Sequence, residues 1–182
     1  MKITETGFEG LYIIQPKVFS DSRGYFFESF KLETFLMAGI PFNPVQDNES
    51  RSVFGVIRGL HYQLNPFAQA KLIRVVVGRI YDIAVDLRKN SRTFGKWYGI
   101  ELDSENKTQF FIPKGFAHGF SVLSDTAVIQ YKCDNLYNPL YEKGISVKDP
   151  YLAIDWKIEA IEPVISNKDQ NQPFFGNAEV NF

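Results

Sequence analysis

The chain has 182 residues, which suits one domain with a sizeable core and is short for two, so we expect residues 1–182 to form a single domain. An apolar content of 45% excludes a disordered chain, and a formal net charge of −1 gives no indication of a nucleic-acid surface. The single cysteine, Cys133, excludes an intrachain disulfide and fits a reducing compartment. The N-terminus has no apolar run typical of a signal peptide, and no stretch approaches the roughly 18 apolar residues of a membrane span. We therefore expect a cytoplasmic protein without a membrane or nucleic-acid partner.

Strand-like segments dominate the chain, and turn residues separate them at intervals of roughly 8–12 residues. In chain order these segments are 11–19, 52–64, 71–88, 97–103, 109–124 and 126–137. One short helix is expected over residues 30–40, where Leu32, Phe35 and Leu36 recur at helical spacing and Gly39 followed by Pro41 signals the end. Residues 162–175 are expected to be irregular or weakly helical. This pattern predicts an all-β fold, a β-sandwich or jelly-roll barrel with few short helices.

The segment 72–87 is apolar on both of its alternating faces, which is typical of a strand buried on both sides. We expect one face to fill the barrel and the other to be covered by a second sheet or a second subunit.

The two histidines, His61 and His118, stand on different predicted strands. A metal site in a jelly roll usually takes two or three histidines and a carboxylate, and this chain has no His-x-His pair and no histidines three or four residues apart. The sequence therefore disfavours a metal site.

His61 lies in "RGLHYQ" (58–63), three residues after Arg58. On residue type alone, a buried imidazole bonded to backbone is the better interpretation. In a regular strand Arg58 and His61 would face opposite sides, but Gly59 between them is typical of a bulge that re-aims side chains. A bulge would direct both side chains into one cavity, where they would need partners or a ligand.

Two further residues are predicted to point inward. Tyr131 shares a face with Ala127, Ile129 and Cys133, so it is either a core tyrosine or a group in the cavity. Lys71 shares a face with the apolar residues that alternate along its strand, and it either extends to solvent or places a positive charge beside a developing oxyanion.

For two more residues the functional and the inert interpretations stay open. His118 lies between Phe116 and Phe120 on one face, and packing and anion binding are equally supported. Asp169, in "SNKDQN", is by default a solvated loop charge. No glycine-rich nucleotide motif is present, so a phosphate would have to be held by individual side chains.

A set of motifs in a fixed order carries a resemblance to a known family. The motifs are "RGLHYQ" (58–63), "QAKLIRV" (69–75), "DIAVDLRKNSRTFGKW" (82–97), "IPKGFAHGFSVLS" (112–124), "YNPLYEKGI" (137–145) and "DPYLAIDW" (149–156). Together they closely resemble the dTDP-4-dehydrorhamnose 3,5-epimerases, from "FSDSRGYFFESF" (19–30) to "ISNKD" (165–169).

The resemblance implies a cupin-like jelly roll, a homodimer, no metal and no organic cofactor. The implied substrate is a dTDP-4-keto-6-deoxy-hexose and the product lies on the route to L-rhamnose. His61 is implied as the general base in a dyad with Asp169, Tyr131 as the acid on the opposite face of the sugar, and Lys71 as the group that stabilises the enolate oxygen. Positions matching those that line the family's nucleotide-sugar site are Arg23, Glu28, Gln46, Asn48, Arg58, His118, Glu142 and Lys168. Arg23 and its neighbours are candidates for the partner subunit's site.

Two alternatives to this activity remain. One is a single-site 3- or 5-epimerase, or a ketoisomerase, acting on a related nucleotide sugar in the same fold. The other is a non-catalytic sugar-binding domain that retains the barrel.

Overall fold

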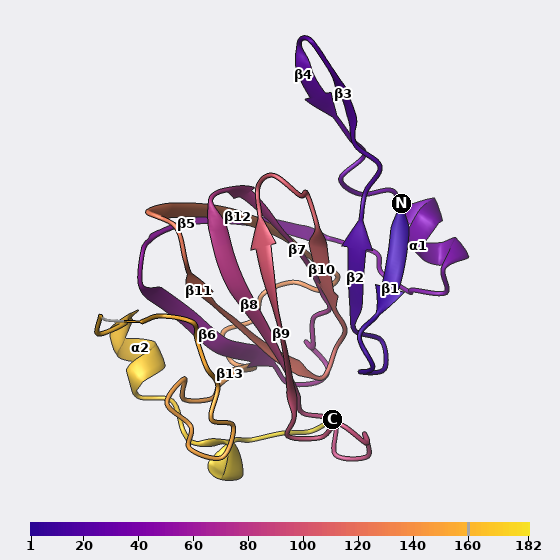
Figure 1. Ribbon diagram of the computed structural model, residues 1–182. Coiled ribbons are helices and arrows are strands. Elements are labelled where there is room, and N and C mark those ends of the chain that lie inside the picture. Colours follow the sequence, from indigo (N-terminus) through magenta and orange to yellow (C-terminus); the bar gives the residue numbers. More distant parts are fainter. Residues whose placement is uncertain (160) are drawn as a thin grey trace.

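The computed structural model describes residues 1–159 and 161–182, and its main elements are two β-sheets that face each other (Figure 1). The first sheet has the spatial order β1 (Lys2–Glu5), β2 (Tyr12–Gln15), β10 (Gln109–Ile112), β7 (Lys71–Val77), β12 (Thr126–Cys133) and β5 (Gln46–Val53). The second has the order β13 (Glu142–Gly144), β6 (Val56–Gln63), β11 (Phe116–Val122), β8 (Arg79–Asp86) and β9 (Trp97–Asp103), and β14 (Val164–Ile165) pairs with β6. The predicted all-β sandwich is confirmed.

Three segments predicted as continuous are each divided between the two sheets, and in this respect the prediction was wrong. The segment 71–88 breaks at Gly78, so that β7 belongs to the first sheet and β8 to the second. Gly78 has φ +80°, and an added Cβ would overlap the Thr126 carbonyl, so only glycine allows this sharp corner. Segments 52–64 and 109–124 divide in the same way, and each of these chain reversals moves the strand to the opposite sheet.

The space between the sheets is filled by side chains from the inward faces of both. Ile73 and Val75 of β7 pack there against Ile80 and Ala84 of β8 and Phe110 of β10. The interior is therefore apolar over most of its length, and any polar group on an inward face needs a specific reason to be there.

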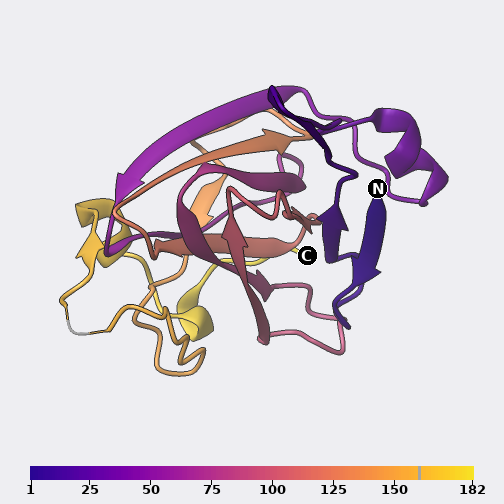
Figure 2. The same ribbon diagram turned by 45° about the horizontal axis from the view of Figure 1, so that its top comes forward.

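Parts of the outer faces are covered by the chain itself, and covering of segment 72–87 by a second subunit stays a prediction. Leu72, on the outer face of β7, packs with Phe35 of α1 (Leu32–Met37). Ile83 and Val85, on the outer face of β8, pack with residues of the C-terminal part such as Trp156. Figure 2 shows α1 and the C-terminal segment on opposite sides of the sandwich.

The single helix predicted over 30–40 is present as α1, but it buries less than its pattern indicated. Phe35 is fully buried, whereas Leu36 is 58% exposed. The chain ends the helix before Gly39, which has φ +73°, as the stop signal predicted.

The C-terminal part is largely irregular, as expected, with the four-residue α2 (Asn167–Gln170) and the 3₁₀ turn Phe175–Asn177. It crosses the outer face of the second sheet, and the Tyr62 hydroxyl donates a 2.7 Å hydrogen bond to the Glu179 carbonyl. This course brings α2 against β6 (Figure 1). Within the described part of the chain, no helix is long and apolar enough to cross a membrane.

Candidate active site

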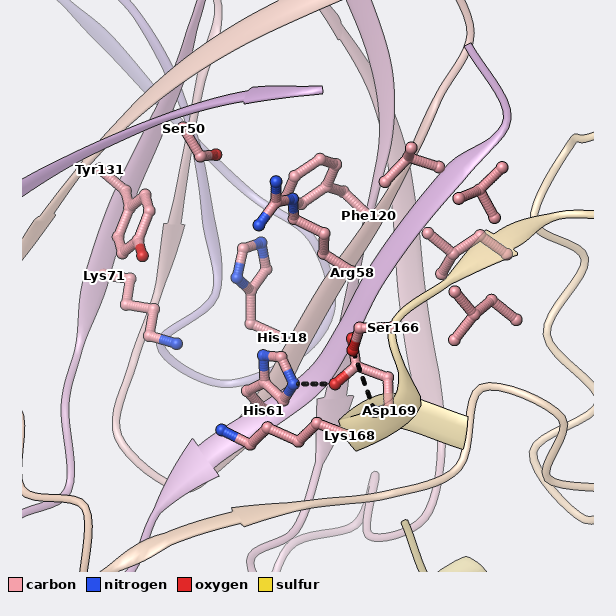
Figure 3. A pocket seen from close by; sticks show the side chains of 14 residues that line it. Ser50, Arg58, His61, Lys71, His118, Phe120, Tyr131, Ser166, Lys168 and Asp169 are labelled. Atoms are coloured by element: carbon pink, nitrogen blue, oxygen red, sulfur yellow. Dashed lines mark hydrogen bonds and ion pairs between the residues drawn. The ribbon is translucent and has the colours of Figure 1, made fainter. Parts of the chain in front are cut away.

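The bulge predicted at Gly59 is present and directs two side chains of β6 into one pocket. His118 of β11 pairs with His61, and Phe120 pairs with Arg58, so two steps along β11 correspond to three along β6. The extra residue reverses the alternation, and Arg58 and His61 both line the same pocket (Figure 3).

His61 and Asp169 form a close pair across 108 residues of sequence. His61 Nε2 lies 2.7 Å from Asp169 Oδ1, and the carboxylate also accepts the backbone N–H of Gly59 at 3.4 Å. Asp169 is only 3% exposed. Burial raises the pKa of this carboxyl, but the hydrogen bonds from His61 and Gly59 outweigh burial and leave the pKa below its usual value. The default interpretation of Asp169 as a solvated loop charge was therefore wrong.

The opposite wall of the pocket comes from the first sheet. Lys71 at the start of β7 and Tyr131 on β12 point into the space that His61 and Arg58 enter from β6 (Figure 3). Burial is the main influence on both groups: it lowers the pKa of Lys71 and raises the pKa of Tyr131. Both expectations of an inward orientation are confirmed, and Tyr131 remains a neutral phenol at physiological pH.

Two adjoining pockets meet at His61, Lys71 and Tyr131. The larger, of about 510 Å³, extends past Arg58 and His118 along β6, and we call it the Arg58 pocket. The smaller, of about 280 Å³, extends towards Gln46, and we call it the Gln46 pocket. A ligand of two parts could therefore place its reacting part between the shared side chains and its other part in either pocket.

His118 lies inside the Arg58 pocket and is nearly buried. Its Nε2 lies 2.9 Å from Asp82 Oδ1, and its ring is 6.3 Å from that of Phe120. It therefore packs beside an aromatic ring and contacts a buried carboxylate, and binding of an anion by His118 stays a prediction.

Four other expected residues lie around the pockets. Gln46 Nε2 donates to Asn48 Oδ1 at 2.9 Å, and both residues line the Gln46 pocket. Lys168 Nζ lies 2.6 Å from Glu142 Oε2, so this ion pair links α2 to β13 at the rim. Burial raises the pKa of Glu142, but the Lys168 and Tyr137 hydrogen bonds outweigh it and lower the pKa overall.

Two expected residues are not brought to the pockets. Arg23 lies in the hairpin of β3 (Phe19–Asp21) and β4 (Gly24–Phe26), which projects from the sandwich (Figure 1). Its side chain is 88% exposed and pairs with Asp21 at 2.7 Å. Glu28 is also exposed. Neither residue lines a pocket with His61 in this single chain.

The structure adds residues that sequence reasoning missed. Ser50, Phe120 and Ser166 line the Arg58 pocket, and Tyr137 lines the Gln46 pocket. Asp82 is buried beneath His118. A signal for Asp82 existed, because a carboxylate alternates with Ile80 and Ala84 on the inward face of β8, where apolar residues are the rule.

The arrangement suits proton transfer on both faces of a small ring. An imidazole backed by a carboxylate can accept a proton, a phenol on the opposite wall can return one, and an ammonium beside both can stabilise a developing oxyanion. The Arg58 pocket, of about 510 Å³, is of the size that small-molecule sites have in proteins. Within residues 1–159 and 161–182, no cluster of three or more His, Cys, Asp or Glu side chains is arranged to hold a metal ion.

Comparisons with known proteins agree on one family. The sequence profile described as dTDP-4-dehydrorhamnose 3,5-epimerase matches residues 5–177. The dTDP-4-dehydrorhamnose 3,5-epimerase of Methanothermobacter thermautotrophicus is 50% identical over 171 residues, which cover 93% of this chain and 92% of that protein.

Solved structures give the same result. The crystal structure of dTDP-4-dehydrorhamnose 3,5-epimerase from Elizabethkingia anophelis has a TM-score of 0.92 and 52% identity, with 97% of each chain covered. The dTDP-6-deoxy-D-glucose-3,5-epimerase from Legionella pneumophila, in complex with dTDP-4-keto-L-rhamnose, has a TM-score of 0.92 and 47% identity, covering 97% of this chain and 93% of that one. Such neighbours have the cupin-like jelly-roll fold that the two facing sheets form here. The chain belongs to the dTDP-4-dehydrorhamnose 3,5-epimerase family.

Proposed function

We propose that this protein epimerises carbons 3 and 5 of dTDP-4-dehydro-6-deoxy-D-glucose and releases dTDP-4-dehydro-L-rhamnose, the precursor of dTDP-L-rhamnose. The whole chain acts as one epimerase domain. Family membership supports the reaction type, and the relative solved with dTDP-4-keto-L-rhamnose supports the class of ligand.

The observation that carries the proposal is the position of a base and an acid on opposite walls of one pocket. Epimerisation removes a C–H proton beside the C4 ketone and returns a proton to the other face of the ring. One group cannot serve both faces, and here His61 enters from the second sheet and Tyr131 from the first (Figure 3).

Each role follows from the chemistry of the side chain. His61 takes the proton, and Asp169 at 2.7 Å holds the ring and stabilises the imidazolium that forms. The electrons move onto the C4 oxygen, and the Lys71 ammonium stabilises the resulting enolate; losing such a donor costs on the order of 3–4 kcal/mol. Tyr131 donates the proton to the opposite face. These steps are proton transfers, so the reaction requires neither an oxidant nor a cofactor.

The remaining pocket residues bind the nucleotide sugar in this proposal. Arg58 and Lys168 supply positive groups in the Arg58 pocket, where the diphosphate oxygens are acceptors, and His118 supplies a ring nitrogen for a sugar hydroxyl. Gln46, Asn48 and Glu142 supply polar groups in the Gln46 pocket.

The test is incubation with dTDP-4-dehydro-6-deoxy-D-glucose in D₂O and measurement of deuterium at each ring carbon by NMR. We expect deuterium at both C3 and C5 and formation of the L-rhamno product, and we expect His61→Ala to abolish exchange at both carbons while the protein stays folded. Label at one carbon alone would support a single-site epimerase instead. Tight binding with no exchange would support a non-catalytic sugar-binding domain.

We also propose a homodimer in which Arg23 and Glu28 act in the partner's site. The exposed Arg23 side chain and the exposed Phe19, Tyr25 and Phe26 of the projecting hairpin support this proposal. Mixing Arg23→Ala with His61→Ala protein should restore part of the activity, because a mixed dimer would contain one site with both wild-type residues. Absence of restoration in a confirmed mixed dimer would contradict the shared site.

A further inference from the structure

A second carboxylate–histidine pair lies inside the sandwich, beside the pair of His61 and Asp169. Asp82 of β8 is 0% exposed and its Oδ1 lies 2.9 Å from His118 Nε2. Its Oδ2 is buried and has no hydrogen-bond partner among the described residues. Buried carboxylate oxygens are normally paired, so this exception calls for a reason.

The surroundings of Asp82 make a purely structural role a poor explanation. Asp82 pairs with Phe120 across β8 and β11, and it alternates with Ile80 and Ala84, which belong to the interior core. Removing a carboxylate from water costs several kcal/mol, and an apolar residue at such a position is often neutral or stabilising. The fold alone therefore gives no reason for a carboxylate at residue 82.

The contact with His118 determines which ring nitrogen carries a proton. A carboxylate only accepts hydrogen bonds, so His118 Nε2 must donate its N–H to Asp82. Nδ1 is then left for a ligand, and it has no hydrogen-bond partner within the described part of the chain. A carboxylate behind a histidine fixes tautomer and ring orientation in this way at many functional sites.

We propose that Asp82 is a positioning residue of the site, which holds His118 in its Nε2–H form and leaves Nδ1 to accept a hydrogen bond from a hydroxyl of the sugar. Its effect on the reaction rests on the proposed epimerase function, because there His118 binds the nucleotide sugar. Its effect on His118 does not depend on that function.

The first test reads the His118 tautomer directly. Long-range ¹H–¹⁵N NMR of the wild-type protein should show the His118 proton on Nε2, and Asp82→Asn should shift the population towards Nδ1–H, because the amide can donate to Nε2. A wild-type His118 protonated on Nδ1 alone would overturn the proposal, and so would an unchanged tautomer in Asp82→Asn. If Asp82→Asn does not fold, Asp82→Ser removes the same charge with less volume, and the wild-type spectrum still decides the tautomer.

The second test separates positioning from stability by kinetics. With the sugar nucleotide as substrate, Asp82→Asn should raise KM by roughly 10-fold with kcat changed less than about threefold, because Nδ1 then carries the proton and no longer accepts a hydrogen bond from the ligand. A KM within about threefold of the wild-type value would overturn the positioning role.

Asp86 on the same strand provides a matched control. It is also 0% exposed, but its carboxylate is bonded by Arg88, Ser91 and Thr93. Asp86→Asn should destabilise the fold without changing the His118 tautomer or KM. If the wild-type protein exchanges no deuterium, the proposed function fails, and the tautomer measurement still decides the role of Asp82.

Discussion

At the scale of single residues, the site contains two ionisable groups whose pKa values burial shifts in opposite directions. Burial lowers the pKa of the Lys71 ammonium and raises the pKa of the Tyr131 hydroxyl. As pH rises, Lys71 therefore loses its proton below the usual lysine range, whereas Tyr131 keeps its proton above the usual tyrosine range.

The alkaline limb of activity should accordingly belong to Lys71. We expect kcat to fall with rising pH at a midpoint below 10.5, the ordinary lysine value. Lys71→Arg should be slower at neutral pH, because the planar guanidinium is larger, but its profile should stay flat through the region where wild-type activity falls. An identical alkaline limb in Lys71→Arg would show that another group is titrating.

Tyr131 should matter for returning the proton and not for removing it. In Tyr131→Phe we expect deuterium exchange into recovered substrate to continue, while formation of the inverted product falls by roughly 10²–10⁴-fold. Mass spectrometry of recovered substrate together with NMR of the product measures both. Equal loss of exchange and inversion would instead place Tyr131 in the proton-removal step.

The residue scale also shows what the sequence could and could not provide. A period of two along β7 and β12 placed Lys71 and Tyr131 inward, and Gly59 indicated the bulge beside His61. The contact of Asp169 with His61 spans 108 residues, and no local pattern determines where a four-residue helix on an irregular segment will dock. Only the family resemblance paired these two residues in advance.

At the scale of elements, β6 is the strand that organises the site. Gly59 has φ +130°, and an added Cβ would lie 2.5 Å from Gly119 Cα and 2.9 Å from the His118 carbonyl oxygen. β6 and β11 therefore approach so closely at the bulge that no side chain fits between them. This contact fixes the relative position of Arg58 and His61.

Gly59→Ala should for this reason damage both stability and the site. We expect a loss of at least about 2 kcal/mol in the free energy of unfolding, from backbone strain plus a clash with backbone atoms that cannot move aside. Chemical denaturation gives the loss. Gly7→Ala is the control, because Gly7 has φ +87° and no atom within 4 Å of an added Cβ. A similar loss in both variants would mean that strain alone, without the clash, explains the effect.

The element scale also explains where sequence reading failed. Segments such as 71–88 read as one strand because apolar residues continue on both sides of Gly78. The chain changes sheet through the backbone conformation at Gly78, and this conformation does not alter the alternation of apolar residues. The outward residues then pack on α1 and the C-terminal segment, which are remote in sequence and therefore could not be assigned from local patterns.

At the scale of the whole molecule, a hydrogen bond from the Tyr62 hydroxyl to the Glu179 carbonyl links the C-terminal segment to the second sheet. Burial, together with the charge of Glu179, raises the pKa of Tyr62 to about 12. The folded state thus binds this proton more tightly than the unfolded state, where the pKa is near 10. The stabilisation is complete below pH 10 and disappears as pH rises towards 12.

Wild-type protein should therefore lose up to about 3 kcal/mol of stability through Tyr62 between pH 10 and pH 12. Tyr62→Phe should be less stable by about 1 kcal/mol at pH 8, where the bond to the Glu179 carbonyl is missing, and should lack this alkaline loss. Urea unfolding of both proteins across this range measures the difference. Parallel stability curves would contradict the assignment, because other tyrosines contribute equally to both proteins.

Because the site is divided between two sheets, substitutions in the core between them can change its geometry. The distance between the Tyr131 hydroxyl and the His61 ring depends on the separation of the two sheets. Residues such as Val75 and Phe110 maintain that separation from within the sandwich. Neither residue lines the pockets, yet a smaller side chain at either position should change the distance between Tyr131 and His61. The spacing of the two proposed proton-transfer groups thus depends on core residues that the substrate would not contact.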